Sequence, residues 1–174
     1  CLESVAGLVD EMVIVDTGST DNTREVSLSY TDRVYDFPWQ DDFAAARNFA
    51  FSKGRMEYLM WLDADDVLLP EDREAFLDLK RTLTPDVDVV MMPYHSGLDE
   101  GGRPVFTCYR ERVVRNLGRD LWEGAVHEAI APFGKVIWSR AAVTHRKEGP
   151  GDPDRNLRIY EQKLARGETL SPRE

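Results

Sequence analysis

Predicted strands and helices alternate through the first ninety residues of the chain, and this alternation constrains the fold most strongly. Short apolar segments predict buried strands, and each ends at a polar turn before a segment with helical spacing. The predicted strands cover residues 11–16, 33–37, 57–62 and 87–92. The predicted helices between them cover residues 22–30, 41–53 and 70–81. Such alternation predicts an α/β fold built on a largely parallel sheet.

The later part of the chain predicts a mixed extension of that sheet. A hairpin adds a strand near residues 105–110, a last strand covers residues 135–145, and a last helix covers residues 155–166. A chain of 174 residues is one domain on the usual length prior. We expect that domain over residues 1–150, with residues 151–174 as a C-terminal helix leading towards a further helical region.

The charge and cysteine content of the chain exclude several kinds of partner. Lys and Arg number 22 against 32 Asp and Glu, a net charge of −10 that argues against nucleic acid and anionic membranes as partners. No apolar run approaches ~18 residues, so we expect no membrane span. Cys1 and Cys108 make no disulfide framework, and so few cysteines fit a reducing, cytoplasmic location. Residues 1–100 hold 8 basic and 22 acidic residues, which would repel a phosphate-bearing ligand unless a cation intervened.

Asp63 and Asp65 follow the predicted strand at residues 57–62. Residues two apart on an extended chain point to the same side, so both carboxylates lie at the carboxyl edge of the sheet, where open α/β folds bind ligands. Because the two charges repel each other, a divalent cation between them is the natural partner. The alternative is a capped loop that leads into an acidic helix start containing Asp66 and Glu71.

Arg47 and Asp16 are further candidates for ligand contact. The helix around Arg47 is apolar on nearly every side, which predicts a buried helix and a buried guanidinium. Such a cation needs an anion, either a carboxylate such as Asp63 or a ligand phosphate, and a purely structural pair is the alternative. Asp16 ends the first strand, where it either accepts hydrogen bonds from a base or ribose or caps the turn.

Residues 122–128 combine Trp122, a glycine and the ionisable side chains of His127 and Glu128. This mixture suits an acceptor pocket with a general base, and an ordinary loop with an exposed glutamate is the alternative. His145 closes the last predicted strand. A neutral imidazole there could complete a carboxylate metal site, although strand-end histidines are often ordinary surface or core residues.

Three segments of the chain together resemble a known family. They are VDTGSTDNT at residues 15–23, ARN at residues 46–48 and WLDADD at residues 61–66. In this order and spacing they resemble the family 2 glycosyltransferases with the GT-A fold, in particular bacterial enzymes of the lipopolysaccharide-core type and enzymes fused to tetratricopeptide repeats. The resemblance implies a mixed, mainly parallel sheet flanked by helices and a role in cell-envelope glycan biosynthesis.

The resemblance implies metal-dependent, inverting transfer of a sugar from a nucleotide-sugar, usually a UDP-sugar. Asp16 would contact the base, and Arg47 would steady the diphosphate or the Asp63 carboxylate. Asp63-Ala64-Asp65 matches the DxD motif of the family. Asp63 would then lie towards ribose and metal, and Asp65 would be the direct ligand of Mn²⁺ or Mg²⁺.

The resemblance also assigns roles to the downstream candidates. Glu128 would be the catalytic base that takes the proton from the acceptor hydroxyl, with Trp122 and His127 at the acceptor site. His145 would add a further metal or phosphate contact. The acceptor would be a glycan, a lipid or a protein.

Two departures from the family pattern alter these expectations. The family opens with a strand upstream of the helix that here begins at Cys1, so we expect an N-terminally truncated fragment in which the first strand is missing. Thr17 stands where many relatives have a second Asp, so we expect one nucleotide contact to be lost or altered.

Two other functions are compatible with the residues. Residues 58–68 also resemble the first motif of haloacid dehalogenase-type phosphatases, in which Asp63 would be the nucleophile and Asp65 the acid/base. That motif normally opens its domain, whereas two strand–helix units precede it here. A catalytically degenerate glycosyltransferase-like module that binds a sugar or a partner is the non-enzymatic alternative.

Overall fold

The computed structural model describes residues 1–146 and 151–170 of the chain. The helices are α1 (Leu2–Val5), α2 (Thr23–Leu28), α3 (Phe43–Lys53), α4 (Pro70–Thr82) and α5 (Arg155–Ala165). The strands are β1 (Ile14–Asp16), β2 (Val34–Asp36), β3 (Tyr58–Met60), β4 (Asp66–Val67), β5 (Val89–Leu98), β6 (Pro104–Arg115), β7 (Trp122–Glu123), β8 (Ala129–Ile130), β9 (Val136–Trp138) and β10 (Val143–His145).

The chain divides into two compact units, each made of segments that are distant in the sequence. The first unit contains Cys1–Met12, Arg55–Leu117 and Pro132–Glu148. The second unit contains Val13–Gly54, Gly118–Ala131 and Gly149–Glu174. Every candidate residue therefore belongs to one unit or the other, and each unit is described by itself.

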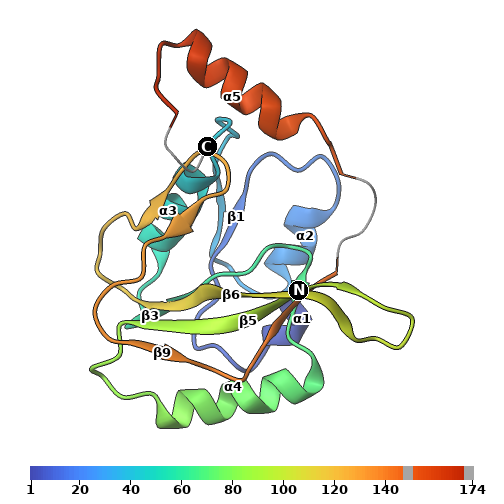
Figure 1. The fold of residues 1–174 in the computed structure, drawn as a ribbon, viewed down its shortest axis with the longest axis vertical. Coiled ribbons are helices and arrows are strands. Elements are labelled where there is room, and N and C mark those ends of the chain that lie inside the picture. The colour runs from blue at the N-terminus through green and yellow to red at the C-terminus, as the bar shows by residue number, and fades with distance from the viewer. Residues whose placement is uncertain (147–150, 171–174) are drawn as a thin grey trace. The chain divides into compact units, whose positions relative to one another are not determined.

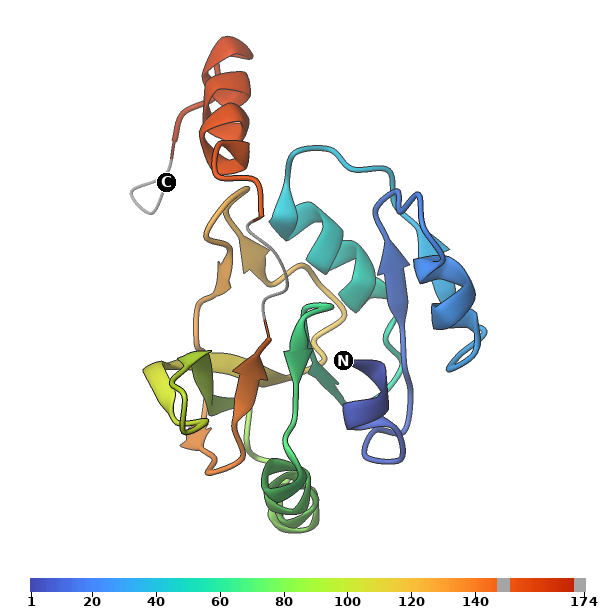
Figure 2. The same cartoon turned by 90° about the vertical axis from the view of Figure 1, so that its right-hand side faces the viewer.

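The first unit is a mixed sheet with α4 packed against it (Figure 1; α4 is seen end-on in Figure 2). The strands run in the order β3-β6-β5-β10-β4, and β9 also pairs with β5. β5 is parallel to β9 and β10, whereas the β5–β6, β3–β6 and β10–β4 ladders are antiparallel. Phe76 of α4 packs with Val90, Met92 and Val113 of the strands to form the core.

The predicted α/β fold with a mixed sheet is confirmed, but its parallel share is smaller than predicted. The reason is that β6 inserts antiparallel between β3 and β5, so these neighbours are not successive βαβ units. The single strand predicted over residues 135–145 is wrong, because residues 139–142 interrupt it between β9 and β10, which both run parallel to β5. Ser139 Oγ accepts the Ala141 N–H at 3.0 Å and Asp72 Oδ1 accepts the Ala142 N–H at 2.7 Å, so these backbone groups hydrogen-bond outside the ladder.

The second unit is built on the parallel pair β1–β2, with α3 against β1 and α2 against β2 (Figure 2). The antiparallel pair β7–β8 packs on α3 through β7, and the buried Ile159 of α5 belongs to a small separate core. Helix α3 starts after Asp42, whose carboxylate accepts the Ala45 N–H at 2.9 Å. The prediction of a buried helix is wrong in extent, since Ala44 is the one buried residue of α3 and most of its other residues are half-buried.

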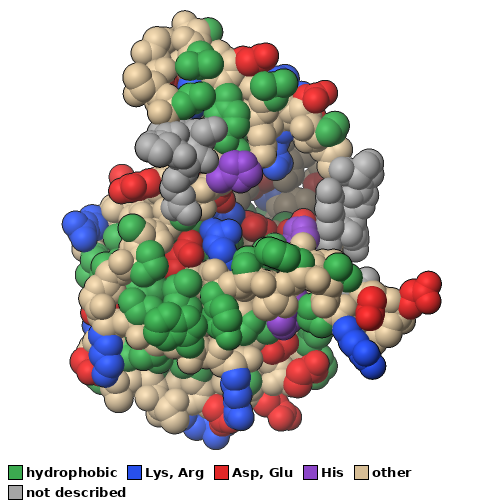
Figure 3. Space-filling model, in the orientation of Figure 1, with side chains coloured by type: hydrophobic (Ala, Val, Ile, Leu, Met, Phe, Trp, Pro, Cys, Tyr) green, Lys and Arg blue, Asp and Glu red, His purple; other side chains and the backbone are tan. Residues whose placement is uncertain are grey.

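Some large apolar side chains stay exposed on the first unit. On β6 and β9 these exposed side chains are Val105 (72% exposed), Phe106 (59%), Tyr109 (51%) and Trp138 (65%). Figure 3 shows hydrophobic side chains gathered over the strands of this sheet. Cys1 and Cys108 are free cysteines. None of the helices in the described ranges combines the length and the apolar character needed to cross a membrane.

Asp72 in the first turn of α4 makes the stability of the first unit depend on pH. Its carboxyl group is buried, and this burial raises its pKa, although the hydrogen bond from the Ala142 N–H acts in the opposite direction. A raised pKa means that the folded state binds the proton more tightly than the unfolded state. Protonated Asp72 therefore stabilises the folded state at low pH. This stabilisation is lost as the pH rises through the raised pKa.

We expect Asp72→Asn, which keeps an oxygen for the Ala142 N–H, to gain stability relative to the unaltered chain as the pH rises from about 4 to about 7. Urea unfolding of both chains at the two pH values measures this change. Asp10→Asn is the control for removing one negative charge, because Asp10 is an exposed partner of Lys80. A stability difference between Asp72→Asn and the unaltered chain that stays constant with pH would contradict the argument.

Candidate active site

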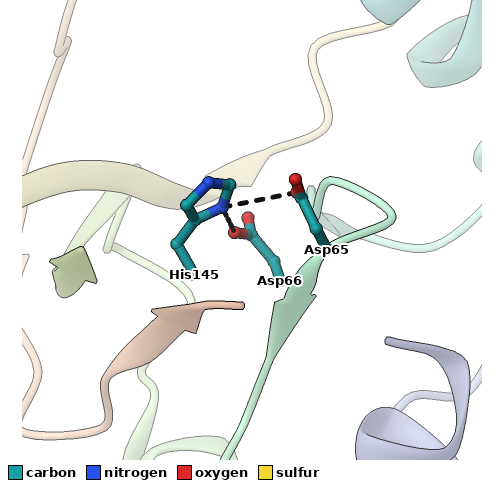
Figure 4. A group of neighbouring side chains, drawn as sticks. All are labelled: Asp65, Asp66 and His145. Atoms are coloured by element: carbon teal, nitrogen blue, oxygen red, sulfur yellow. Dashed lines mark hydrogen bonds and ion pairs between the residues drawn. The ribbon is translucent and has the colours of Figure 1, made fainter. Parts of the chain in front are cut away.

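Asp65, Asp66 and His145 form a cluster where β4 and β10 meet, here called the Asp–His cluster (Figure 4). The antiparallel register pairs His145 directly with Asp66, which brings the imidazole beside the carboxylates at the start of β4. His145 Nδ1 lies 3.4 Å from Asp65 Oδ1 and 3.4 Å from Asp66 Oδ1. The Asp66 side chain is fully buried, whereas those of Asp65 and His145 are 41% and 21% exposed. Two of the three groups are therefore open to a ligand from solvent.

The donor groups of the Asp–His cluster fit a divalent cation. One ligand atom from each residue lies within 4.8 Å of the others. Carboxylate oxygens and an imidazole nitrogen are ligands that suit Mn²⁺, and carboxylates suit Mg²⁺. Ligands at right angles around an ion about 2.1 Å away stand about 3 Å apart. The two 3.4 Å separations are close to that spacing, so the structure brings the predicted metal ligands Asp65 and His145 together and adds Asp66.

Asp63 and Asp66 close the turn between β3 and β4. The Asp66 N–H donates to the Asp63 carbonyl oxygen at 3.0 Å, and the Asp63 N–H donates to Asp66 Oδ2 at 3.2 Å. The three-residue cluster contains Asp66 where the sequence suggested Asp63. The sequence alone offers an ordinary explanation for Asp66, as an acid near a helix start. The one signal for a role in the site is its adjacency to Asp65.

Asp16 ends β1 in the second unit. Its Oδ1 accepts the Ser19 N–H at 3.0 Å and the Ser19 hydroxyl at 2.6 Å. These hydrogen bonds hold the pKa of Asp16 below its ordinary value, so the carboxylate is charged at neutral pH. The structure thus contains the capped turn that was one of the two alternatives for Asp16.

Arg47 and Glu128 form a largely buried ion pair in the second unit. Arg47 Nε donates to Glu128 Oε1 at 2.7 Å, and the two side chains are 17% and 12% exposed. The Arg47 guanidinium lies 4.8 Å from the ring centroid of Trp122, which is 3% exposed. Asn48 holds the backbone of Trp122 in place. Its side chain accepts the Trp122 N–H and donates to the Trp122 carbonyl oxygen, both at 3.0 Å. The carboxylate that a buried Arg47 requires is supplied by Glu128, and Trp122 supports the pair from a buried position.

His127 lies next to Glu128 in a turn with unusual backbone angles. Its φ of 54° and that of Gly124, 97°, both fall in the left-handed region, where a residue other than glycine is strained. Strained backbone conformations of this kind are frequent at functional sites. The His127 side chain is exposed, so the predicted acceptor segment presents a polar ring to solvent while Trp122 stays buried.

A mixed α/β domain in which an apolar strand runs into clustered carboxylates is compatible with the class of GT-A glycosyltransferase domains. Comparison with family models identifies the family within that class. The chain belongs to glycosyl transferase family 2, whose model matches residues 1–134, and the resemblance found in the sequence is confirmed. This assignment favours the glycosyltransferase interpretation over the phosphatase alternative.

Two of three curated relatives are named glycosyltransferases. The chain is 37% identical over 130 residues to a TPR repeat-containing protein of Synechococcus elongatus, covering 75% of this chain and 31% of the relative. It is 28% identical over 179 residues to the SPbeta prophage-derived glycosyltransferase SunS of Bacillus subtilis, covering 94% and 41%. It is 31% identical over 144 residues to the lipopolysaccharide core biosynthesis glycosyltransferase LpsC of Rhizobium meliloti, covering 78% and 53%. The chain thus spans between 31% and 53% of the length of these relatives.

Proposed function

We propose that the chain carries out metal-dependent transfer of a sugar from a nucleotide-sugar, a UDP-sugar, to an acceptor hydroxyl, with inversion at the anomeric carbon. The observation that carries this proposal is the convergence of Asp65, Asp66 and His145 at a strand end within a family 2 domain. The similarity to LpsC, named for lipopolysaccharide core biosynthesis, supports an acceptor in cell-envelope glycan synthesis.

On the donor side, the Asp–His cluster would hold Mn²⁺ or Mg²⁺. The chemistry that such a cation supplies is Lewis-acid stabilisation of the charge that develops on the departing nucleoside diphosphate. Asp63 would contact the ribose and Asp16 the base. The two hydrogen bonds from Ser19 support this role for Asp16, because they keep its carboxylate charged and fixed in orientation.

On the acceptor side, Glu128 would take the proton from the acceptor hydroxyl as its oxygen bonds to the anomeric carbon and the bond to the diphosphate breaks. Arg47 orients Glu128 through the 2.7 Å hydrogen bond and would also steady the diphosphate. The exposed His127 ring would contact the acceptor, and the buried Trp122 would support Arg47.

Thermal unfolding in the presence of UDP tests the donor side of this proposal. We expect UDP to raise the melting temperature only when Mn²⁺ or Mg²⁺ is present, and Asp65→Ala to abolish the rise. The reason is that Asp65 is the most exposed ligand of the cluster. Loss of a residue that only hydrogen-bonds to a metal ligand typically weakens metal binding ~10–100-fold. Loss of the ligand Asp65 itself should weaken Mn²⁺ binding by more than that.

Asp10→Ala is the matched control for Asp65→Ala, because Asp10 is 70% exposed and pairs only at the surface with Lys80. Exposed pairs of this kind contribute little to stability. Equal stabilisation by UDP in EDTA and in Mn²⁺ would contradict the role of the metal. An absence of UDP affinity under every condition would favour the non-enzymatic binding module.

A further inference from the structure

Arg112 is a fully buried cation beside the Asp–His cluster. It lies in β6 at a bulge, where the register shifts between the pairs Val113–Val90 and Glu111–Met91 and leaves Arg112 with no residue opposite it on β5. A bulge redirects a side chain out of the regular alternation of a strand and is often found beside active sites. This local irregularity is what allows a charged side chain of β6 to enter the core.

The Arg112 guanidinium is held by hydrogen bonds and by two aromatic rings. Its Nη1 donates to Asp66 Oδ2 at 2.8 Å and to the Trp61 carbonyl oxygen at 3.3 Å. The group also lies 3.7 Å from the ring centroid of Trp61 and 4.4 Å from that of Tyr94. Aromatic faces stabilise a planar cation at such distances, so the guanidinium has one well-defined orientation.

The two carboxylate oxygens of Asp66 have different partners. Oδ2 accepts the Arg112 hydrogen bond and the Asp63 N–H at 3.2 Å. Oδ1 faces His145 Nδ1 at 3.4 Å (Figure 4). Rotation of Asp66 would break these bonds, so Oδ1 stays directed at His145.

We propose that Arg112 is the positioning residue of the cation site, holding Oδ2 of Asp66 so that Oδ1 is presented to the metal. The inference rests on the proposed function, since it assigns a role at the same site. Arg112 also neutralises one of two adjacent carboxylates, Asp65 and Asp66, whose mutual repulsion would otherwise open the cluster before a cation binds. A buried ion pair by itself seldom adds net stability, so the fixed direction of Oδ1 explains the arrangement better than stability does.

Arg112→Lys tests this role. Lysine keeps the charge, but it lacks the planar group that packs against the rings of Trp61 and Tyr94, so Asp66 loses its fixed orientation. We expect Mn²⁺ binding to weaken about 10–100-fold, measured without nucleotide by electron paramagnetic resonance of free Mn²⁺ at constant pH. We also expect the His145 ring signals of the metal-free protein to shift in nuclear magnetic resonance spectra.

Arg115→Lys is the matched control. Arg115 lies on the same strand, its Nε donates to Asp88 Oδ1 at 2.9 Å, and its guanidinium lies 5.2 Å from the ring centroid of Tyr58. We expect this variant to lose stability while its Mn²⁺ affinity and its His145 signals remain those of the unaltered protein. Unchanged Mn²⁺ binding in Arg112→Lys, or an equal loss in both variants, would overturn the proposal.

Tyr94→Leu decides the question if Arg112→Lys does not fold. It removes one of the two rings that lie against the Arg112 guanidinium and keeps an apolar side chain, so we expect Mn²⁺ binding to weaken about 2–10-fold. Unchanged binding in Tyr94→Leu would then overturn the proposal. Failure of the unaltered protein to bind Mn²⁺ is a different result, because it contradicts the proposed function before any substitution is made.

Discussion

Glu128→Gln is expected to lower the turnover of a UDP-sugar about 10²–10⁴-fold, the usual contribution of a general base, while the affinity for UDP is unchanged. Glutamine keeps the size of the side chain and an oxygen for the 2.7 Å hydrogen bond from Arg47 Nε, so the fold of the second unit should persist. It cannot accept the proton of an acceptor hydroxyl. UDP release with saturating Mn²⁺ measures turnover, and UDP titration measures affinity.

Glu123→Gln is the control for the same chemical change in the same unit. Glu123 lies in β7 and is exposed, so its substitution should leave both turnover and UDP affinity as they are. Turnover that survives Glu128→Gln would show that another group is the base. A parallel loss of turnover and UDP affinity would show instead that Glu128 acts by holding Arg47 in place.

Local signals in the sequence were sufficient to predict most of the helices and strands. Helix α4 starts at Pro70 and has acids in its first turn, and the predicted range 70–81 differs from the observed one by a single residue. The apolar run at residues 57–62 contains β3 and leads into Asp63 as expected. These predictions succeeded because the apolar run, the proline and the acidic first turn each act within a few residues along the chain.

Pairings between distant residues could not be predicted in this way. Arg47 and Glu128 are 81 residues apart, and the apolar helix around Arg47 indicates only that some anion is needed. The burial of Arg112 in a strand could not be predicted for a second reason. The strand near residues 105–110 was predicted too short, since the charged residues that follow are unusual in a buried strand and the bulge interrupts its alternation.

Gly134→Ala is expected to lower the free energy of unfolding by about 2–4 kcal/mol, the sum of a backbone and a packing cost. Gly134 has a φ of 57°, and a Cβ there would stand 2.0 Å from Asp88 Oδ2 and 2.9 Å from Asp88 Cβ. Asp88 cannot easily retreat, because its carboxylate accepts Arg115 Nε at 2.9 Å and the Lys135 N–H at 2.8 Å. For a chain of this size we expect the melting temperature to fall by about 5–15 °C.

Gly102→Ala separates the backbone cost of Gly134→Ala from its packing cost. Gly102 has a φ of 75°, but a Cβ there would meet nothing within 4 Å, so this variant should lose only the backbone contribution of about 1 kcal/mol. The excess loss in Gly134→Ala then measures the collision with Asp88. Because Asp88 fixes the start of β9 beside β5 through Lys135, that collision should destabilise the whole sheet of the first unit. Equal melting temperatures for the two variants would mean that Asp88 moves aside and that its ion pair with Arg115 does not hold the sheet in register.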